Sequence, residues 1–264
     1  MASKLNAGQR KAADLINQGE DTFVTGPAGT GKSHLLRQVC DDLRSRGKSV
    51  MVVAPTGSAA LNARGITIHR ACGLRIGPVV SDAFQVPENF DSVEVLIVDE
   101  VSCARIDVID RLLGTVEKAN AGRRTLRGNP SAAKRRLDAG YPVEDIQVVV
   151  VGDFGQLSPF CGKHEEYEAL RLKYGGGWDG SLYAFSSALW ERMRFKVVEL
   201  TEPMRQQDDE FVHALNLLRF GDASALSWIA AHASKTPPEG AVFLCGRNAT
   251  VDTVNRRELG KLPG

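Results

Sequence analysis

The chain has 264 residues, of which 43% are hydrophobic and 25% charged, a composition typical of soluble globular proteins. Its formal net charge of +1 excludes a general electrostatic attraction to nucleic acid, so any such contact must come from a local patch. The five cysteines form no C-x-x-C pair, and neither a signal peptide nor a bilayer-spanning apolar run is present. We therefore expect a protein of the cytoplasm or the nucleus that is not secreted and has no membrane partner.

The first helix signal lies in the segment Leu5 to Arg10, and it has two interpretations. Asn6 followed three residues later by Gln9 is the pattern of a capping box, in which two side chains satisfy free amides at a helix start. The amide of Gln9 could instead form paired hydrogen bonds to the edge of adenine. The two interpretations are compatible, and the pattern alone does not separate them.

The most informative motif runs from Gly26 to Ser33 and fits the phosphate-binding pattern G-x-x-x-x-G-K-[ST]. A β-rich run, Asp21 to Thr25, precedes it, and an amphipathic helical pattern, His34 to Leu43, follows it, as the motif requires. In such a loop the backbone amides surround the phosphates, the lysine reaches the terminal phosphates and the hydroxyl holds a magnesium ion. The predicted nucleotide-binding residues are Gly26, Pro27, Ala28, Gly29, Thr30, Gly31, Lys32 and Ser33.

Small polar residues follow the second apolar run, Val50 to Val53, and are candidates for contact with a nucleic acid strand. Loops with hydroxyl side chains and accessible backbone suit phosphate contacts along a single strand. His69 has no partner visible in the sequence, so a structural role is the alternative for it. The candidate DNA-contact residues are Pro55, Thr56, Gly57, Thr67 and His69.

Two carboxylates, Asp99 and Glu100, directly follow the third apolar run, Val93 to Val98. Beside a phosphate loop such a pair can divide its work: the aspartate holds magnesium, and the glutamate takes a proton from the attacking water. The alternative is an exposed acidic pair at the end of a strand. We expect Ser33 and Asp99 to hold the metal and Glu100 to act as the general base.

A basic segment lies between Lys118 and Gly140, where seven lysines and arginines are accompanied by one acid, Asp138. One interpretation is a solvated and mobile insertion. The other is a surface that contacts a phosphate backbone. The sequence leaves both interpretations open.

Two further apolar runs, Ile146 to Val151 and Phe195 to Leu200, are followed by side chains that suit a phosphate site. Gln156 could contact the terminal phosphate or the water, although a glutamine in a glycine-containing loop can also be a turn residue. Arg205 could stabilise charge in the transition state, although a plain surface arginine is the alternative. With Lys32 and Glu100, these two residues complete the predicted catalytic set.

Near-continuous valine and isoleucine runs alternate with amphipathic helical patterns along the chain. This alternation predicts an α/β fold in which a parallel sheet is covered by helices on both faces. Ligands of such a sheet lie at the carboxyl ends of its strands. We expect a first domain over residues 1–200, with excursions at about 73–92, 118–145 and 160–182.

The pattern restarts after Leu200, and residues 201–264 look like the incomplete beginning of a second domain. Asp208 or Asp209 can cap a helix there. A further apolar run, Val242 to Cys245, predicts a strand of this second domain.

Taken in order, these segments resemble the PIF-type (petite integration frequency) DNA helicases, RecD-like motors of superfamily one, type B. The resemblance begins with the family's adenine-reading Q motif at Leu5 to Arg10. It continues with motif I at Gly26 to Ser33, motif Ia at Ala54 to Ala60, a DNA-contact segment at Thr67 to His69, motif II at Val98 to Ser102, motif III at Gly152 to Pro159, and a family-specific stretch from Tyr183 to Gly221.

The resemblance implies a RecA-like P-loop NTPase domain with the start of a second one. It implies an ATP-dependent DNA helicase that uses ATP and Mg²⁺, moves 5′ to 3′ on single-stranded DNA and unwinds duplex. The partner would be single-stranded DNA or DNA with a single-stranded tail, and the family's work lies in DNA replication, DNA repair and telomere maintenance. We expect a monomer.

The resemblance covers nearly the whole chain but only the front part of the family's motor, so we expect an ATPase fragment. Its departures are the basic segment Lys118 to Gly140 and the pair Pro203-Met204, where the family more often has an aromatic residue. A second hypothesis is therefore a module that binds nucleotide and DNA without efficient turnover. A small-molecule kinase is a third, but it does not explain Gln156 and Arg205.

Overall fold

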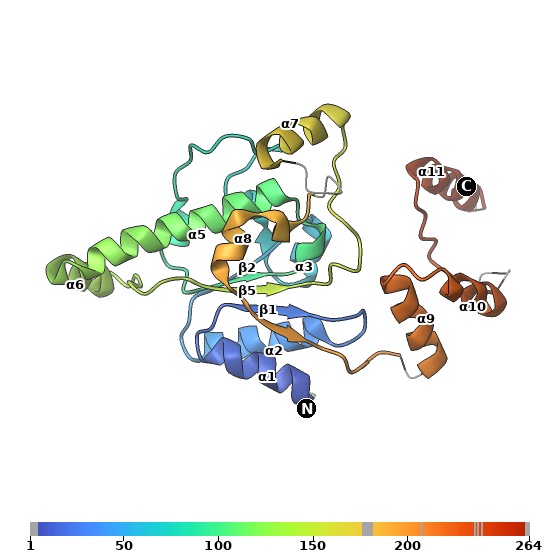
Figure 1. The fold of residues 1–264 in the computed structure, drawn as a ribbon, viewed down its shortest axis with the longest axis horizontal. Helices are drawn as coiled ribbons and strands as arrows, with labels where there is room; N and C mark the ends of the chain where they lie inside the picture. Colours follow the sequence, from blue (N-terminus) through green and yellow to red (C-terminus); the bar gives the residue numbers. More distant parts are fainter. Residues whose placement is uncertain are drawn as a thin grey trace.

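The computed structural model of the chain describes residues 5–175, 182–206, 208–234, 236, 238 and 240–261. Within these ranges, six strands form one parallel sheet in the order β3-β2-β4-β5-β1-β6 (Figure 1). The parallel α/β fold expected from the sequence is confirmed. The strands are β1 (Thr22–Thr25), β2 (Val50–Ala54), β3 (Ile66–Thr67), β4 (Val95–Val98), β5 (Gln147–Val151) and β6 (Lys196–Glu199).

Helices cover both faces of the sheet because the central strands are apolar on both sides (Figure 1). Leu96 and Val98 point to one face, while Val95 and Ile97 point to the other, as the two-residue period of a strand requires. The first face packs against α4 (Ile68–Ala71), α5 (Ile106–Arg127) and α8 (Ala188–Met193), and the second against α1 (Ala7–Asn17) and α2 (Lys32–Ser45).

The five apolar runs expected as strands of the first domain all form strands, with ends shifted by at most a few residues. No sequence pattern predicted β3, which has only two residues, Ile66 and Thr67. The predicted helix after the phosphate loop is α2, and its apolar stripe faces the core as expected. The shorter elements are α3 (Gly57–Asn62), α7 (His164–Tyr174) and the 3-10 turns Glu88–Phe90, Val101–Cys103 and Ala184–Ser186.

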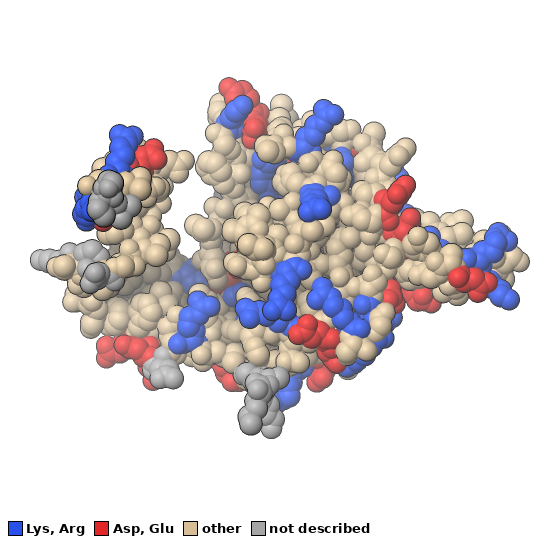
Figure 2. Space-filling view, turned by 180° about the vertical axis from the view of Figure 1, so that it is seen from behind, with Lys and Arg blue, Asp and Glu red and all other residues tan. Residues whose placement is uncertain are grey.

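The basic segment is helical, and both interpretations of it, a solvated and mobile insertion and a surface for a phosphate backbone, stay predictions. It comprises the end of α5 and α6 (Pro130–Asp138), which project from one end of the molecule; we call residues 118–140 the arm (Figure 1). Seen from behind, blue and red side chains are mixed on the arm and on the rest of this face (Figure 2). The excursion at 73–92 is largely irregular, and that at 160–182 contains α7 but falls partly outside the described residues.

The C-terminal helices are α9 (Asp209–Arg219), α10 (Ser224–His232) and α11 (Asn248–Leu259), and they lie to one side of the sheet (Figure 1). Asp208 caps α9 by accepting a hydrogen bond from the amide of Phe211 at 3.0 Å, as the sequence indicated. The predicted strand from Val242 to Cys245 is wrong. A strand needs a hydrogen-bonded neighbour; no described strand pairs with this segment, and Val242 and Leu244 are almost fully exposed.

Among the described residues, no helix combines the length and the apolar character needed to cross a membrane.

Candidate nucleotide site

The phosphate loop connects β1, which lies between β5 and β6, to α2, and its shape depends on glycine. Gly26 has φ 141°, and a Cβ atom added to it would lie 2.2 Å from the carbonyl oxygen of Leu200. Gly31 has φ 81° and opens α2, where a Cβ would lie 2.4 Å from Nε2 of Gln9. Side chains at these two positions would be strained and would collide, so the backbone runs where only glycine fits.

Lys32 is the first residue of α2, and its ammonium group lies over the phosphate loop. Nζ donates hydrogen bonds to the carbonyl oxygens of Gly26 at 2.7 Å and Pro27 at 3.0 Å. Burial lowers the pKa of Lys32, while the nearby carboxylates of Asp153, Glu100 and Asp99 act against this shift. The cation is therefore held beside acids at the mouth of the loop.

Asp99 and Glu100 stand at the carboxyl end of β4, as predicted. Asp99 is buried, and burial together with the charge of Glu100 raises its pKa to about 6. Its Oδ1 atom accepts a hydrogen bond from the amide of Glu100 at 3.0 Å. Glu100 has φ 53°, a left-handed conformation that is strained for a glutamate, and strain of this kind concentrates at functional sites.

The structure brings the predicted catalytic residues to one pocket of about 410 Å³, which we call the nucleotide pocket. Asp99 lies in the adjoining hollow, where Ser33 and Arg205 are again part of the lining. The exposed-pair alternative for Asp99 is wrong. The residues of the nucleotide pocket are Ala28, Gly29, Gly31, Lys32, Ser33, His34, Arg37, Glu100, Gln156, Met204 and Arg205.

Oxygen donors are available for a magnesium ion at this pocket. Ser33 offers a hydroxyl and Asp99 a carboxylate, the hard oxygen ligands that Mg²⁺ prefers. No group of three or more histidine, cysteine or acidic side chains suited to a metal occurs in the described part of the chain. The site therefore fits a magnesium ion that receives its remaining ligands from phosphates and water, as such ions usually do.

Gln156 lies in the loop after β5, but its amide is turned toward a neighbouring acid. Nε2 donates to Oδ2 of Asp153 at 3.0 Å, and Asp153 is 1% exposed. Oδ1 of Asp153 accepts from the amide of Gly155 at 3.1 Å and from Nε of Arg219 at 2.9 Å. Sequence reasoning missed Asp153 and Arg219 as a pair, because α9 follows β5 only after a long intervening stretch and no local pattern links them.

An aromatic cluster fixes the start of this loop. Phe154 lies between Phe23 on β1 and the side chains of Tyr183, Phe185 and Trp190, with ring centroids 4.8 to 5.9 Å apart. Such tilted and edge-on pairs stabilise packing beyond simple burial. The segment from Tyr183 to Trp190, with which the family-specific stretch begins, thus packs against the loop that carries Asp153 and Gln156.

Gln9 forms the predicted capping box. Its backbone amide donates to Oδ1 of Asn6 at 2.8 Å, and its Oε1 accepts from the amide of Asn6 at 3.0 Å. Nε2 donates to the carbonyls of Thr30 and Gly31 at 3.4 and 3.3 Å and to Sδ of Met204 at 2.9 Å. The side chain is fully buried and joins α1 to the phosphate loop, and base reading by it stays a prediction.

A second and larger hollow, of about 910 Å³, lies at the carboxyl ends of β2 and β3. It brings together Pro55, Thr56, Thr67 and His69 of the five predicted DNA-contact residues, while Gly57 is not in its lining. Thr56 and Thr67 cap α3 and α4 through their hydroxyls. Burial and the charge of Arg105 lower the pKa of His69, which favours the neutral ring.

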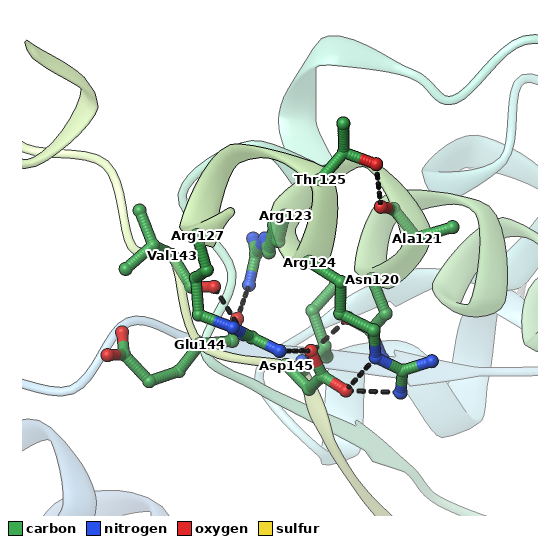
Figure 3. Close-up of polar contacts among 10 residues, drawn as sticks. Asn120, Ala121, Arg123, Arg124, Thr125, Arg127, Val143, Glu144 and Asp145 are labelled. Carbon is green, nitrogen blue, oxygen red and sulfur yellow. Dashed lines mark hydrogen bonds and ion pairs between the residues drawn. The ribbon is translucent and has the colours of Figure 1, made fainter. Parts of the chain in front are cut away.

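Several arginines of the arm bond to neighbouring parts of the chain, although Arg124 and Arg127 are also exposed to solvent (Figure 3). Arg123 is 2% exposed and donates to the carbonyls of Phe90, Asp91 and Glu144 at 2.9 to 3.0 Å. Arg124 and Arg127 both pair with Asp145 (Figure 3). Of the other basic side chains, Arg136 bonds the carbonyl of Pro142 and Lys118 that of Phe84, while Lys134 and Arg135 are exposed.

The sequence pattern described as "PIF1-like helicase" matches residues 4–226 of the chain. The ATP-dependent DNA helicase PIF1 of Emericella nidulans is 30% identical over 267 residues, which cover 95% of this chain and 32% of that protein. The protein of the same name from Candida albicans is 33% identical, over 98% of this chain and 28% of that protein. The chain thus spans about a third of the length of these curated relatives.

Solved structures give the same result. The chain resembles Bacteroides Pif1 bound to ssDNA with a TM-score of 0.75 and 28% identity, over 98% of this chain and 57% of that one. It resembles Bacteroides Pif1 helicase in complex with ADP-AlF3 and ssDNA with a TM-score of 0.75 and 28% identity, over 99% of this chain and 58% of that one.

Proposed function

Because the chain belongs to the PIF1-like helicase family, we propose that it is the ATPase front part of an ATP-dependent DNA helicase. The whole motor hydrolyses ATP to move 5′ to 3′ along single-stranded DNA and to unwind duplex ahead of it. One observation carries the proposal: Lys32, Glu100, Gln156 and Arg205, which come from four separate strand ends and loops, meet in a single pocket.

In this proposal Lys32 leaves the carbonyls of Gly26 and Pro27 and donates to the terminal phosphates of ATP. Arg205 approaches the same phosphates from the segment after β6 and offsets the negative charge of the transition state. Gly26 to Ser33 supply the backbone amides that surround the phosphates. Gln9 joins the adenine side of the pocket through its contacts with Gly31 and Met204.

Glu100 is the general base of the proposed reaction. Its left-handed backbone sets it at the pocket, while Asp99 lies in the adjoining hollow. Glu100 takes a proton from water as that water attacks the terminal phosphorus; the bond from this phosphorus to the bridging oxygen breaks, and ADP leaves with the electron pair. Gln156 orients the water once its amide has turned from Asp153. Ser33 and Asp99 would hold a magnesium ion, which neutralises charge on the phosphates when bound.

Single-stranded DNA would occupy the hollow at the ends of β2 and β3. Pro55, Thr56, Thr67 and His69 line this hollow and supply its polar and apolar contacts, with Gly57 next to Thr56 in the chain. A neutral His69 suits stacking or hydrogen bonding rather than charge pairing. This hollow and the nucleotide pocket both lie at the carboxyl edge of one sheet, so closure around ATP can change the grip on DNA.

We further propose that residues 1–200 form the first RecA-like domain, that residues 201–264 begin the second, and that the chain acts as a monomer. A module that binds nucleotide and DNA without efficient turnover is the alternative for this chain, because it spans only part of its relatives. Strong stimulation of ATP hydrolysis by single-stranded DNA in these 264 residues would rule the module out.

The assignment of the base is tested with Glu100→Gln. We expect loss of ATP hydrolysis, measured as phosphate release, with equilibrium binding of a fluorescent ATP analogue unchanged. Glu117→Gln, which changes an exposed glutamate of α5, is the matched control and should hydrolyse ATP normally. Full turnover in Glu100→Gln would remove Glu100 from the mechanism.

A further inference from the structure

Arg219 is the last residue of α9, and its side chain reaches back to the sheet. Nε donates to Oδ1 of the buried Asp153 at 2.9 Å, and Nη1 lies 3.4 Å from Oε1 of Glu199 at the end of β6. The arginine side chain is 16% exposed, whereas Glu199 is 52% exposed. The pair with Asp153 is therefore the well-shielded one, and it joins the C-terminal helices to the loop after β5.

The carboxylate of Asp153 is shared between α9 and the nucleotide pocket. Oδ1 accepts from Arg219, and Oδ2 accepts from Nε2 of Gln156 at 3.0 Å. If Gln156 turns toward a bound phosphate, Oδ2 loses this partner. The forked guanidinium of Arg219 can then donate to both oxygens of Asp153, the stronger two-point arrangement.

Pro27 and Ala28 of the phosphate loop and Val212 and Leu215 of α9 line a hollow of about 230 Å³ between the two segments. Gly155 lies beneath the arginine: a Cβ atom added there would be 2.5 Å from Cγ of Arg219. The aliphatic part of the Arg219 side chain thus crosses the loop backbone at a glycine, and its position depends on the space that this glycine leaves.

We infer that Arg219 is a positioning residue that makes the attachment of α9 depend on the nucleotide: through Asp153 it senses whether Gln156 is turned to the terminal phosphate. With ATP in the pocket the link between α9 and the sheet is tight, and with ADP or no nucleotide it is looser because Gln156 competes for Asp153. The inference rests on the proposed function. It gives the hydrolysis site a direct connection to the helices that follow the first sheet.

Hydrogen exchange of the α9 amides tests this inference, measured with a non-hydrolysable ATP analogue and Mg²⁺, with ADP and Mg²⁺, and without nucleotide. In the wild type we expect several-fold slower exchange with the ATP analogue than with ADP. Arg219→Ala should abolish that difference. Gly155→Ala should abolish it too, because the new methyl group displaces the side chain of Arg219, although this substitution removes no charged group.

The effects of Arg219→Ala and Gly155→Ala on the nucleotide-dependent exchange of α9 should not be additive. In the Arg219→Ala background the Cγ atom is gone, so Gly155→Ala should have no further effect. Glu199→Gln removes only the outer partner and should keep the nucleotide-dependent difference, as should Arg192→Ala, a matched exposed arginine on α8. If Arg219→Ala unfolds because Asp153 is left unpaired, Asp153→Asn/Arg219→Ala removes the stranded charge and should fold without the difference.

Binding of a fluorescent ATP analogue is measured in parallel for every variant. Absence of binding in the wild type would refute the proposed function and the inference with it. Normal binding with no nucleotide-dependent difference in wild-type α9 would overturn the inference alone. So would a difference that survives in Arg219→Ala.

Discussion

The arm and the nucleotide pocket are both rich in charged side chains, and they use them in opposite ways. In the arm, Arg123, Arg124 and Arg127 are occupied by backbone carbonyls and by Asp145. In the pocket, Lys32 donates to carbonyls of its own loop, and in the adjoining hollow the buried Asp99 accepts a hydrogen bond of 3.0 Å from the adjacent amide. Most arginines of the arm already have partners within the protein, whereas the charged groups of the pocket can exchange their partners for a ligand.

The difference teaches that the density of charge in a sequence does not mark the site of function. The arm holds seven basic residues in a short stretch, yet most of them fasten the segment that leads into β5. The pocket gathers its few charges from distant parts of the chain. Removing a pocket charge should therefore reduce function at little cost in stability, and removing a buried arm charge should do the reverse.

Lys32→Ala should give the largest effect. We expect ATP hydrolysis to fall by about 100-fold or more, the loss typical of removing one donor that stabilises transition-state charge. Urea unfolding should show a free energy of unfolding close to that of the wild type, since two loop carbonyls lose a partner but can bond water. If Lys32→Ala lost much of its stability but kept ATP hydrolysis, the expectation that pocket charges serve function rather than stability would be wrong.

Arg123→Met should give the largest effect on stability. Three backbone carbonyls lose a charged and buried donor, which should lower the free energy of unfolding by about 3 kcal/mol. The measurement is urea unfolding, with the exposed Arg135→Met as the control that should change little. Binding of an ATP analogue by the folded variant should be unchanged, and a loss of binding would tie the arm to the pocket.

The raised pKa of Asp99 leads us to expect an unusual dependence of the free energy of unfolding on pH. Burial and Glu100 raise its pKa to about 6, so its contribution to stability is present below the unfolded pKa and is lost as pH rises through 6. Asp99→Asn should therefore be more stable than the wild type at pH 8, on the order of 2 to 3 kcal/mol, and this gain should vanish near pH 4. Urea unfolding across that range measures it.

The same titration should affect ligand binding in the opposite direction. Protonated Asp99 cannot serve as an anionic ligand, so the affinity for Mg²⁺ with an ATP analogue should fall as pH decreases from 7 to 5. A titration of the magnesium dependence of analogue binding checks this. Affinity that does not change over this range would take Asp99 out of the metal site.

The smallest effect is expected from Lys134→Ser/Arg135→Ser at the tip of the arm. These are the exposed basic side chains of the arm without a described partner. If the arm contacts a phosphate backbone, these two side chains are the candidates for that contact. We expect the affinity for single-stranded DNA to change less than about twofold and its salt dependence to stay the same. A marked loss of affinity would give the arm a binding role.

The sequence predicts most of the sheet and the pocket for physical reasons. Valine and isoleucine runs buried on both faces make unambiguous strands, and the glycines and Lys32 of the phosphate loop form a local motif. Asp99, Glu100, Gln156 and Arg205 follow because parallel strands end at one edge. Local pattern is sufficient wherever the chemistry lies within a few residues of a strand end.

Contacts between distant segments could not be predicted in this way. The sequence left two interpretations of the arm open, because arginines that bond carbonyls in the folded protein have the same composition as arginines in solvent. The pair of Asp153 with Arg219 depends on where α9 packs, which no periodicity encodes. The segment from Val242 to Cys245 has the composition of a strand, but composition does not supply the neighbour that a strand needs.

The position of β1 in the sheet determines when the nucleotide pocket can form during folding. Thr22 pairs with Val149 on one side and with Lys196 on the other, so the strand that carries the phosphate loop has neighbours encoded far downstream. Pairings of such long sequence separation form late and slowly. On the ribosome, the nucleotide pocket can therefore close only after β6 has emerged, and until then the early part of the chain exposes an unpaired strand edge.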